Sequence, residues 1–512
     1  MVKEDKIASI ADLASFCKKN GFVFQSGEIY GGLAGFWDYG PLGAELRNNI
    51  KSLWWGAFVR KREDVVGIDG AIITHPMVWK ASGHVDSFTD PLVDCLKCKE
   101  RHRADNMLED VGVENADALS IERMDELIQK KKIKCPKCKG DLGNVRRYNL
   151  MFRTQVGPVE SESSISYLRP ETAQLIFSNF QFVQKINRMK LPFGIAQIGR
   201  SFRNEISPRN FLFRDREFEQ MEIEFFVHPD EYNKCPFMDE VNELVLNAYS
   251  SENQLKKQKM KKIALKELVK KKIMKANWQA YWIAKQYYWF IELGVSPDNL
   301  RVRQHLPDEK SHYALDTWDI EYQFPFGWKE LQGIANRTTF DMTQHMKYSK
   351  KDLQYFDEET GKKVVPYVVA EPSQGVERAF LVFITDSYRK ENSGTKDERV
   401  VLKLHPKLSP IKIAVFPLLK NDDNLVKKSR EIFNELREHF ETFYDSSGSI
   451  GRRYRRMDEV GTPYCITVDH KTIEDNTVTV RDRDSMEQMR VKTDELVNYL
   501  RELLSGKIKF SK

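Results

Sequence analysis

The segment from Phe218 to Val227, FEQMEIEFFV, alternates between apolar and polar side chains with a period of two residues. Because successive side chains of a β-strand point to opposite faces of a sheet, this alternation predicts a strand. The face that would pack against the body of a domain carries Met221, Ile223, Phe225 and Val227. The other face carries Phe218, Gln220, Glu222 and Glu224. The chain is therefore expected to contain a sheet in which one strand has an aromatic ring and several carboxylates on a single face.

The string just before this strand, Phe202-Arg203-Asn204-Glu205, adds a cation and an anion two positions apart. On a strand, Arg203 and Glu205 would project from the same face. Arginine can hold a phosphate there, and the carboxylate can accept from the amino group of an adenine. At about 3.3 Å per residue, Phe218 and Glu222 would lie roughly 13 Å apart, about the length of an adenine–ribose–phosphate with a small acyl group attached. These residues predict a nucleotide site without a phosphate-binding loop.

The segment between the two strings, residues 206–217, is a basic loop with Arg209, Arg214 and Arg216. Guanidinium groups suit polyphosphate oxygens or the end of an RNA. The alternative is an antiparallel hairpin with salt bridges across a solvated face, which is the better explanation for any single Arg/Glu pair. The whole set of residues favours the nucleotide site.

These strings resemble a known family. Phe202–Glu205, the basic loop and REFEQMEIEFF resemble motif 2 of the class II aminoacyl-tRNA synthetases, and GVERAF, which begins at Gly375, resembles their motif 3. Longer strings are similar to the homodimeric (α2) type of glycyl-tRNA synthetase: GFWDYGPLGAELRNNIKSLWW (35–55), RPETAQ (169–174), GIANRTTFDMTQH (333–345) and EPSQGVER (371–378). The resemblance implies that glycine is activated with ATP to glycyl-adenylate and then transferred to the 3′ end of tRNA(Gly). It also implies Mg²⁺ with ATP and a homodimer.

The resemblance assigns the nucleotide end of the site. Arg203 would bind the α-phosphate, Glu205 the adenine edge, and Phe218 would stack under the ring. Arg378 would cover the other face of the ring and reach the terminal phosphate, so that Arg203, Glu205 and Arg378 form the catalytic set. The full ATP-binding set that it implies is Arg203, Asn204, Glu205, Phe213, Arg214, Phe218, Glu330, Leu331, Gly375 and Arg378, with Arg214 on the β- and γ-phosphates and Glu330 on ATP or its magnesium.

The resemblance also assigns an acidic pocket for glycine. The implied residues are Arg103, Glu171, Phe218, Gln220, Glu222, Glu371 and Ser373. The glutamates would meet the ammonium group, and Arg103 the carboxylate. A pocket gains only about 1–3 kcal/mol from one methyl group, so alanine must be rejected by steric exclusion in a small, stiff cavity. Three glutamates exceed the need of one ammonium, so some would orient others or bind through water. For Ser373 the alternative is a helix N-cap before Val376–Ser387.

The implied fold class is α/β (α+β): a class II synthetase catalytic domain on an antiparallel sheet flanked by helices, plus a C-terminal α/β anticodon-binding domain. The length of 512 residues and a hydrophobic fraction of 41% agree with two or three domains. We expect the catalytic domain over residues 1–405, with an insertion at 90–147 and a helical insertion at about 230–310, and the anticodon-binding domain over 406–512.

Charge and targeting signals constrain the partners only weakly. The net charge is +6, which permits a polyanionic partner without naming RNA. The N-terminal residues MVKEDKIASIADL lack the apolar stretch of a signal peptide, and no run reaches the length of a membrane span. We expect a cytoplasmic protein that does not interact with a membrane.

Four of the seven cysteines form two CxxC pairs, Cys95/Cys98 and Cys135/Cys138. Each pair can present two thiolates to one ion, and two pairs complete a tetrahedral sulfur shell of the structural zinc type. The alternative is a metal-free insertion with incidental cysteines. Cys17, Cys235 and Cys465 are isolated and are interpreted as packing residues. The cysteine pattern indicates a reducing compartment.

Three further segments have alternative interpretations. Residues 44–58 predict an amphipathic helix, whose Trp54 and Trp55 either form a dimer interface or face the core. Residues 255–275, rich in lysine, predict a solvated amphipathic helix, with tRNA contact as the second hypothesis. After about residue 406, strands at 411–418, 464–468 and 477–480 and helices at 424–441 and the C-terminus predict a separate α/β domain. In that domain, Arg452, Arg453, Arg455 and Arg456 either contact RNA or form a charged helix face.

Two rival functions remain. A catalytically silent relative acting as an RNA-binding or polymerase-accessory subunit would not need the residues of the proposed site together, and all are present. A synthetase for another amino acid is the closer competitor, and the acidic RPETAQ and EPSQG strings argue against it.

Overall fold

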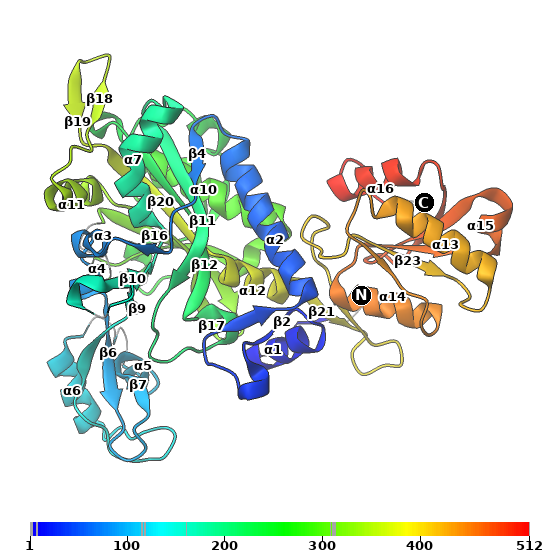
Figure 1. The fold of residues 1–512 in the computed structure, drawn as a ribbon, viewed down its shortest axis with the longest axis horizontal. Helices are drawn as coiled ribbons and strands as arrows, with labels where there is room; N and C mark the ends of the chain where they lie inside the picture. The colour runs from blue at the N-terminus through cyan, green and yellow to red at the C-terminus, as the bar shows by residue number, and fades with distance from the viewer. Residues whose placement is uncertain are drawn as a thin grey trace.

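The computed structural model describes residues 4–6, 9–113, 116, 119–159, 161–307, 309 and 314–510. Figure 1 shows a large body built around one sheet, a small domain at the C-terminal end on the right, and an elongated insertion at the lower left. Within the described part of the chain, no helix combines the length and the apolar character needed to cross a membrane.

The body is organised by a nine-stranded sheet with the order β14-β13-β15-β16-β17-β20-β12-β11-β4. In that order the strands are Lys261–Ala264, Val245–Tyr249, Leu300–Gln304, Asp316–Phe324, Gly327–Asn336, Tyr367–Gly375, Glu217–Val227, Phe193–Phe202 and Val65–Ile68. All neighbours are antiparallel except the pairs β13/β15 and β11/β4. The antiparallel sheet expected from the sequence is confirmed.

The predicted strand at 218–227 is β12, and its apolar face lies in the main core as expected. Met221, Ile223 and Phe225 are fully buried. They pack with helices α2 (Pro41–Trp55), α10 (Asn277–Glu292) and α12 (Val376–Ser387). On the opposite face, α7 (Ala173–Asn187) and α11 (Phe340–Ser349) form a second core with Phe193 and Phe226. The polar residues of β12 therefore face the α7 side of the sheet.

The N-terminal helix differs from its prediction. It begins at Pro41 and continues after Trp55 as a π-helical turn over Gly56–Arg60. Trp54 is fully buried and packs beside Phe58, so its interpretation as an interface residue is wrong, whereas Trp55 is only partly buried. The side chains of Trp54 and Phe58 both belong to the main core, and this packing accounts for the inward orientation of Trp54.

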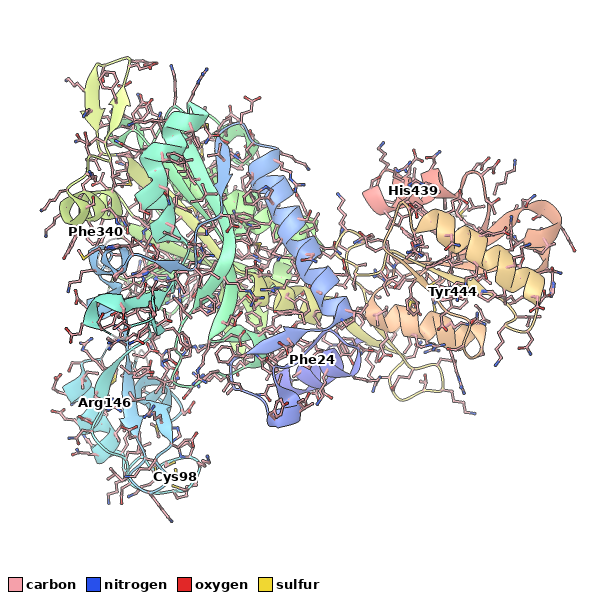
Figure 2. All side chains as sticks on the ribbon, in the orientation of Figure 1. Phe24, Cys98, Arg146, Phe340, His439 and Tyr444 are labelled. Atoms are coloured by element: carbon pink, nitrogen blue, oxygen red, sulfur yellow. The ribbon has the colours of Figure 1, made fainter. Side chains whose placement is uncertain are left out.

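The insertion at 90–147 is a small unit with its own core. Strands β6 (Thr89–Asp94), β7 (Arg101–Arg103) and β8 (Arg146–Asn149) form a sheet, and helices α5 (Ala104–Glu109) and α6 (Ile121–Lys130) pack against it. Cys98 lies at the far tip of this unit and Arg146 nearer the body (Figure 2).

The segment at about 230–310, predicted to be helical, is mixed. It contains α8 (Ser251–Leu255), α9 (Leu265–Lys270) and α10, but also β13, β14 and β15 of the main sheet. The single helix predicted over 255–275 is wrong, because residues 261–264 pair with β13 at the edge of the sheet. Lysines 256, 257 and 259 between α8 and β14 are exposed. Sheet pairing overrides the helical spacing of the apolar residues here.

Shorter elements complete the body. They are β1 (Glu4–Asp5), α1 (Ile10–Lys19), β2 (Val23–Gln25), β3 (Trp37–Tyr39), β5 (Ile73–Thr74), α3 (Pro76–Ala81), α4 (His84–Ser87), β9 (Arg153–Gln155), β10 (Ile165–Leu168), β18 (Tyr355–Asp357), β19 (Lys362–Val364), β21 (Tyr388–Glu391) and β22 (Arg399–Leu402).

The C-terminal region forms an α/β domain with a five-stranded sheet of order β24-β23-β25-β26-β27. Its elements are β23 (Ile413–Pro417), α13 (Asp423–Leu436), β24 (Thr442–Tyr444), α14 (Ile450–Val460), β25 (Tyr464–Val468), α15 (His470–Asp475), β26 (Thr477–Asp482), β27 (Gln488–Lys492) and α16 (Leu496–Ser505). The domain has a core of its own. However, Phe416 and Met457 belong to the main core, so the two domains share packed side chains.

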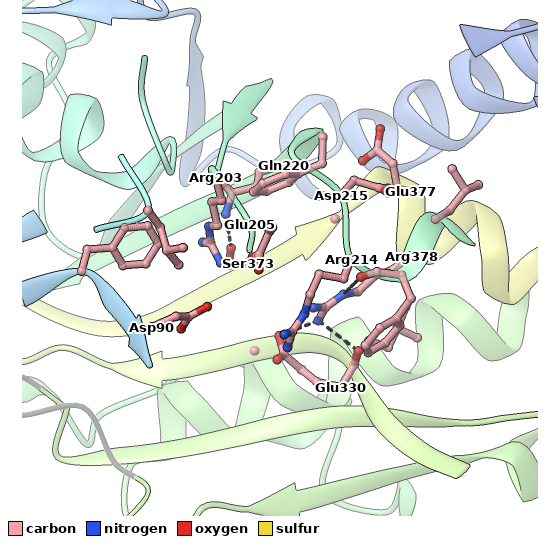
Figure 3. A pocket seen from close by; sticks show the side chains of 18 of the residues that line it. Asp90, Arg203, Glu205, Arg214, Asp215, Gln220, Glu330, Ser373, Glu377 and Arg378 are labelled. Carbon is pink, nitrogen blue, oxygen red and sulfur yellow. Dashed lines mark hydrogen bonds and ion pairs between the residues drawn. The ribbon is translucent and has the colours of Figure 1, made fainter. Parts of the chain in front are cut away.

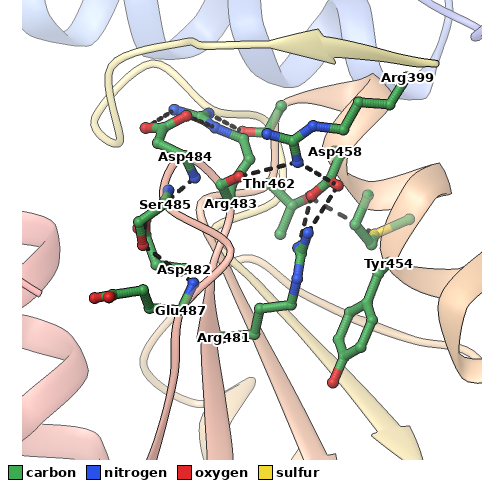
Figure 4. Close-up of polar contacts among 12 residues, drawn as sticks. Arg399, Tyr454, Asp458, Thr462, Arg481, Asp482, Arg483, Asp484, Ser485 and Glu487 are labelled. Atoms are coloured by element: carbon green, nitrogen blue, oxygen red, sulfur yellow. Dashed lines mark hydrogen bonds and ion pairs between the residues drawn. The ribbon is translucent and has the colours of Figure 1, made fainter. Parts of the chain in front are cut away.

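A buried ionic network joins the C-terminal domain to β22 (Figure 4). Arg399 donates to Glu391 and, at 2.9 Å, to Asp458. Arg481 binds the same Asp458 carboxylate through two hydrogen bonds of 2.8 and 3.0 Å. Arg483 donates to the carbonyl oxygen of Gly461. The network links a strand before residue 405 to α14 and β26 after it.

Candidate functional site

The candidate site begins at the hairpin of β11 and β12. The register places Ser201 opposite Phe218 and Gln197 opposite Glu222. β11 ends at Phe202, so Arg203 and Glu205 lie in the following loop and not on a strand as predicted. The amide of Glu205 donates to the carbonyl oxygen of Arg203 at 2.6 Å, which forms a tight turn. Both side chains nevertheless reach the same cavity.

This cavity has a volume of about 340 Å³ (Figure 3). The value lies within the range of roughly 300–1,000 Å³ that is typical of ligand-binding pockets. Twelve residues predicted for the site line it: Arg103, Arg203, Glu205, Phe213, Arg214, Phe218, Gln220, Glu330, Leu331, Ser373, Gly375 and Arg378. They come from β7, the loop after β11, β12, β17, β20 and α12. The structure thus brings together residues that are far apart in the sequence.

Arg203 is held between two aromatic rings. Its guanidinium carbon lies 5.2 Å from the centroid of the Phe218 ring and 5.5 Å from that of Phe88. Its Nε donates to the carbonyl oxygen of Pro170 at 3.1 Å. Attraction between the cation and the ring faces, with this hydrogen bond, orients the remaining donors of the guanidinium toward the cavity.

Arg378 occupies the opposite wall. Its guanidinium carbon lies 4.5 Å from the centroid of the Phe213 ring. Nη1 lies 3.1 Å from the Glu330 carboxylate and donates to the Glu330 carbonyl oxygen, also at 3.1 Å. The stacked geometry leaves a planar cation facing the cavity, a role for which lysine is not equivalent.

Two buried polar atoms in the cavity lack a hydrogen-bond partner among the described residues: Nη1 of Arg214 and Oε2 of Glu205. Buried polar groups are nearly always paired, so such atoms indicate where a ligand binds. Arg103 Nη1 approaches Glu205 only to 3.9 Å. Burial, with repulsion from Arg103, lowers the pKa of Arg214, which agrees with a site prepared for an anion.

Arg103 is surrounded by carboxylates other than those of the predicted glycine pocket. It donates to Asp90 and makes two hydrogen bonds to Asp105. Burial, with the nearby Glu205 and Asp105, raises the pKa of Asp90 to about 6, although Arg103 opposes the rise. The guanidinium of Arg103 also lies beside Glu205. Its contact with the carboxylate of glycine stays a prediction.

At the end of the site toward α7, β12 meets the RPETAQ string. Thr172 donates its hydroxyl to the carboxylate of Glu222, which is 1% exposed. The Gln220 side-chain oxygen accepts from the Thr172 amide at 3.2 Å, and its nitrogen donates to Ser373 Oγ at 3.2 Å. Ser373 lies opposite Glu222 in the sheet. These contacts hold the Glu222 carboxylate in place behind Gln220 and Ser373, which line the cavity.

The other two predicted glutamates are fixed by different partners. Glu371 accepts from Arg337 at 2.7 Å, and Arg337 also binds Asp341. Glu171 lies 3.3 Å from His84 and accepts from Gln174. Burial raises the pKa of Glu171, but attraction to His84 and Arg337 outweighs it and leaves that pKa below its usual value. Glu171, Glu222 and Glu371 do not line the main cavity, and Glu222 and Glu371 are buried behind its lining residues Gln220 and Ser373.

Two sequence interpretations need correction or qualification. Asn204 does not line the cavity, because its side chain donates to the Tyr148 hydroxyl at 2.8 Å. The N-cap of α12 is Gly375, so the alternative role of Ser373 as that cap is wrong.

Sequence reasoning missed several residues of the site. The cavity is also lined by Phe88, Asp90, Leu150, Leu212, Asp215, Gly333 and Glu377. The sequence contained a signal for Glu377, because this residue directly precedes Arg378 in the GVERAF string. One of its oxygens accepts from the Glu219 amide at 2.8 Å, and the other lies 3.1 Å from Arg47, so it ties α12 to β12 and α2. Phe88 and Asp90 had no local signal.

The two CxxC pairs converge at the tip of the insertion. Sγ atoms lie 3.4 Å apart for Cys95 and Cys138 and 3.7 Å apart for Cys98 and Cys135, and all four lie within 4.8 Å of one another. A zinc–sulfur distance of about 2.3 Å gives tetrahedral edges of about 3.8 Å. The four sulfurs therefore fit one zinc ion, and the nearby His102, 3.3 Å from Cys135 Sγ, is a polar neighbour.

Known proteins are similar to this chain over nearly its whole length. Residues 158–388 match the model of the tRNA synthetase class II core domain (G, H, P, S and T), and residues 412–503 match that of the anticodon binding domain. Glycine–tRNA ligase of Treponema denticola is 46% identical and covers 97% of this chain and 98% of its own. The enzyme of Geobacillus thermodenitrificans is 47% identical with the same coverage. The chain belongs to the glycine–tRNA ligase family. Its class II core ends with α12, and the anticodon-binding domain begins just before β23.

Solved structures of other synthetases share the fold. Prolyl-tRNA synthetase from Cryptosporidium parvum, complexed with L-proline and AMP, has a TM-score of 0.56 at 16% identity and covers 99% of this chain and 80% of its own. A structure titled as the RNA binding domain of threonyl-tRNA synthetase from the same organism has a TM-score of 0.58 at 17% identity. The match covers 97% of this chain and 98% of that structure's chain. At these identities the likeness concerns the fold alone.

Proposed function

We propose that this chain activates glycine with ATP and transfers it to the 3′ end of tRNA(Gly). The observation that carries the proposal is one cavity with Arg203, Arg214 and Arg378 on its walls, whose lining residues Gln220 and Ser373 adjoin the buried Glu222. The arginines suit a triphosphate, and the pocket suits a small ammonium-bearing substrate. Family membership agrees with this assignment.

The first step is an in-line attack by a glycine carboxylate oxygen on the α-phosphorus of ATP. The new oxygen–phosphorus bond forms as the bond to the bridging oxygen breaks, and pyrophosphate leaves. Arg203 stabilises the charge on the α-phosphate, while Phe218 and Arg378 hold the adenine between them. The Glu205 carboxylate, whose Oε2 has no partner among the described residues, accepts from the amino group at the adenine edge. No protein nucleophile is required.

The second step uses the same site. A ribose hydroxyl at the tRNA end attacks the carbonyl carbon of the adenylate, and AMP leaves with the bonding electrons. Arg214 holds the β- and γ-phosphates in the first step and is left without them in the second. Magnesium, when bound with ATP, neutralises phosphate charge, and the Glu330 carboxylate facing the cavity fits as its protein ligand.

Glycine is selected by the pocket at Glu222. Its ammonium group meets Glu222, with Glu171 and Glu371 close by, and Ser373 and Gln220 restrict the space beside the α-carbon. Because the walls are strands and the start of α7 joined by hydrogen bonds, a methyl group cannot be accommodated without moving them. Alanine is therefore excluded by shape.

The decisive experiment is ATP–pyrophosphate exchange measured with each of the twenty amino acids, followed by charging of tRNA(Gly). Exchange that depends on glycine alone is the expected result. Exchange driven by another amino acid would contradict the glycine assignment, and no exchange at all would favour the silent-relative hypothesis.

We also propose that two copies pair along strand β4. This strand is the last of the nine in the described part of the sheet. Beside it, α7 exposes Phe182 and Ile186, which line a groove with Gly67 and Ile68. An unpaired strand edge flanked by exposed apolar side chains is suited to association. Light scattering should give a dimer for the wild type and a monomer for Phe182→Glu, whereas Leu255→Glu, also highly exposed, should leave the dimer intact.

The insertion is proposed to bind one zinc ion through Cys95, Cys98, Cys135 and Cys138, and the domain after about residue 406 to bind the anticodon. A groove lined by residues 418–422, 448–450 and Arg453 supports an RNA contact there. Arg453 itself is 1% exposed and donates to the carbonyl oxygen of Pro417, so its role is structural, while Arg452 remains exposed. A cytoplasmic location stays a prediction that follows from the tRNA substrate.

A further inference from the structure

Glu224 is a buried acid that has no part in the proposed activation of glycine. It lies two residues beyond Glu222 on the polar face of β12 and is fully buried. Neither of its carboxyl oxygens has a hydrogen-bond partner among the described residues. An ionised carboxylate in such a place would be severely penalised, so the protonation state of Glu224 needs an explanation.

Two other acids lie close to Glu224. Carboxyl oxygens of Glu222, Glu224 and Glu371 all lie within 4.8 Å of one another. The sheet pairs Glu222 with Ser373 and Phe225 with Ala370, and this register sets Glu224 opposite Glu371. Like charges directly opposite each other in a sheet repel, so both members of this pair cannot be ionised without cost.

Hydrogen-bond donors are distributed unequally over the three acids. Glu371 accepts from Arg337 at 2.7 Å, and Glu222 accepts from the Thr172 hydroxyl. These donors favour the ionised form of both residues. Glu224 is the member of the cluster without a donor, so it is the best place for a proton.

The charges around Glu224 lead to the same assignment. The groups facing it are Glu222 on its own strand, Glu371 on β20, Arg337 after β17 and Asp341 on α11. Only Arg337 is a cation, and Asp341 binds two of its nitrogens. Burial, followed by repulsion from Glu371, raises the pKa of Glu224 well above its usual value. Burial also raises the pKa of Glu371 and of Glu222, although Arg337 opposes the rise for Glu371 and the Thr172 hydroxyl opposes it for Glu222. The hydrogen-bond donors, which Glu371 and Glu222 have, therefore decide the position of the proton.

We propose that Glu224 is a positioning residue that keeps its proton at neutral pH and donates it in a hydrogen bond to Glu371. Glu371 is then held from two sides, by Glu224 and by Arg337, and Glu222 remains the anion for the substrate ammonium. The inference rests on the proposed glycine pocket.

The test compares Glu224→Gln, Glu224→Leu and Glu222→Gln in ATP–pyrophosphate exchange, with KM measured separately for glycine and ATP. Glutamine retains shape and a donor, so Glu224→Gln should change KM for glycine by less than about threefold. Leucine removes the donor, and its KM for glycine should rise by about tenfold or more with KM for ATP unchanged. Glu222→Gln should raise KM for glycine strongly.

A spectroscopic measurement tests the proton directly. Infrared difference spectra at neutral pH, wild type minus Glu224→Gln or minus Glu224→Leu, should contain the carbonyl band of a protonated carboxylic acid. Absence of that band overturns the proposal. So does a rise in KM for glycine in Glu224→Gln as large as in Glu222→Gln, or a Glu224→Leu variant that binds glycine normally. If wild-type chain shows no glycine-dependent exchange, the proposed function fails, and the infrared result still decides the state of Glu224.

Discussion

The guanidinium carbon of Arg203 lies 5.2 Å from the centroid of the Phe218 ring, so the residue after one strand of the hairpin stacks beside a residue near the start of the next. Phe88 from the segment before β6 approaches the same guanidinium from another side. The cation that is proposed to meet the α-phosphate is therefore oriented before ATP arrives, and it lies against the ring that is proposed to stack on the adenine.

Arg203→Ala should lower glycine-dependent exchange by about 10²–10³-fold, because it removes a preorganised charge contact to the reacting phosphate. Arg203→Lys should recover little of this, since lysine retains the charge without the planar, stacked geometry. Thermal unfolding should stay close to that of the wild type. Near-normal exchange in Arg203→Ala would contradict the assignment of this residue.

Glu222→Gln should raise KM for glycine by at least about tenfold, because the amide cannot offer a charge to the ammonium group. KM for ATP should change little. Glu217→Gln, the same substitution on the same strand at a site outside the main cavity, is the matched control and should leave both constants unchanged. If KM for ATP rises instead, the two ends of the site have been assigned in reverse.

Cys95→Ser should abolish the binding of one zinc ion per chain, measured by elemental analysis, because three thiolates leave the tetrahedral shell incomplete. Exchange should suffer less than tRNA charging, since the cysteines lie at the tip of the insertion, away from the cavity (Figure 2). Cys235→Ser removes an isolated cysteine and should not alter the zinc content. A fully active wild type without metal would refute the zinc proposal.

Asp90→Asn tests the electrostatic environment of the Asp90 carboxylate, which accepts a hydrogen bond from Arg103. The pKa of Asp90 is raised from 3.8 to about 6, so the folded protein binds a proton there more tightly than the unfolded chain. Stability from this group is greatest below pH 3.8 and declines as the pH rises to about 6. Relative to Asp90→Asn, the wild type should therefore lose up to about 3 kcal/mol between these pH values. Denaturant titrations of both proteins across this range measure the difference, and parallel curves would contradict the raised pKa.

Asp458→Asn should destabilise the protein by about 3–5 kcal/mol, since it leaves Arg399 and Arg481 as buried cations without their shared carboxylate. Asp484→Asn removes a carboxylate that also makes two hydrogen bonds to an arginine but is half exposed, and it should cost only about 0–1 kcal/mol. Equal effects in chemical denaturation would show that burial of the network contributes nothing.

The sequence allowed prediction of those parts in which local pattern and final contacts coincide. The alternation at 218–227 defined β12, and the strings around Arg203 and Arg378 gave most of the cavity lining. It failed where a distant segment decided the outcome. Asp90 and Phe88 line the same cavity as residues of β12, which are far from them in the sequence, and residues 261–264 are a strand because β13 is available to pair with them. Neither partner leaves a trace in the local sequence.

The carboxylate of Asp458, which two arginines share, restricts the rotation of the C-terminal domain relative to the catalytic domain. Because Arg399 before the C-terminal domain and Arg481 within it bind one buried anion, turning the domain would separate charges that have no water to receive them. The distance between the catalytic cavity and the far end of the molecule is thus fixed in the folded chain. An RNA that contacts both the catalytic cavity and the far end of the C-terminal domain must span this fixed distance in its own folded shape. The protein therefore selects its RNA substrate by length.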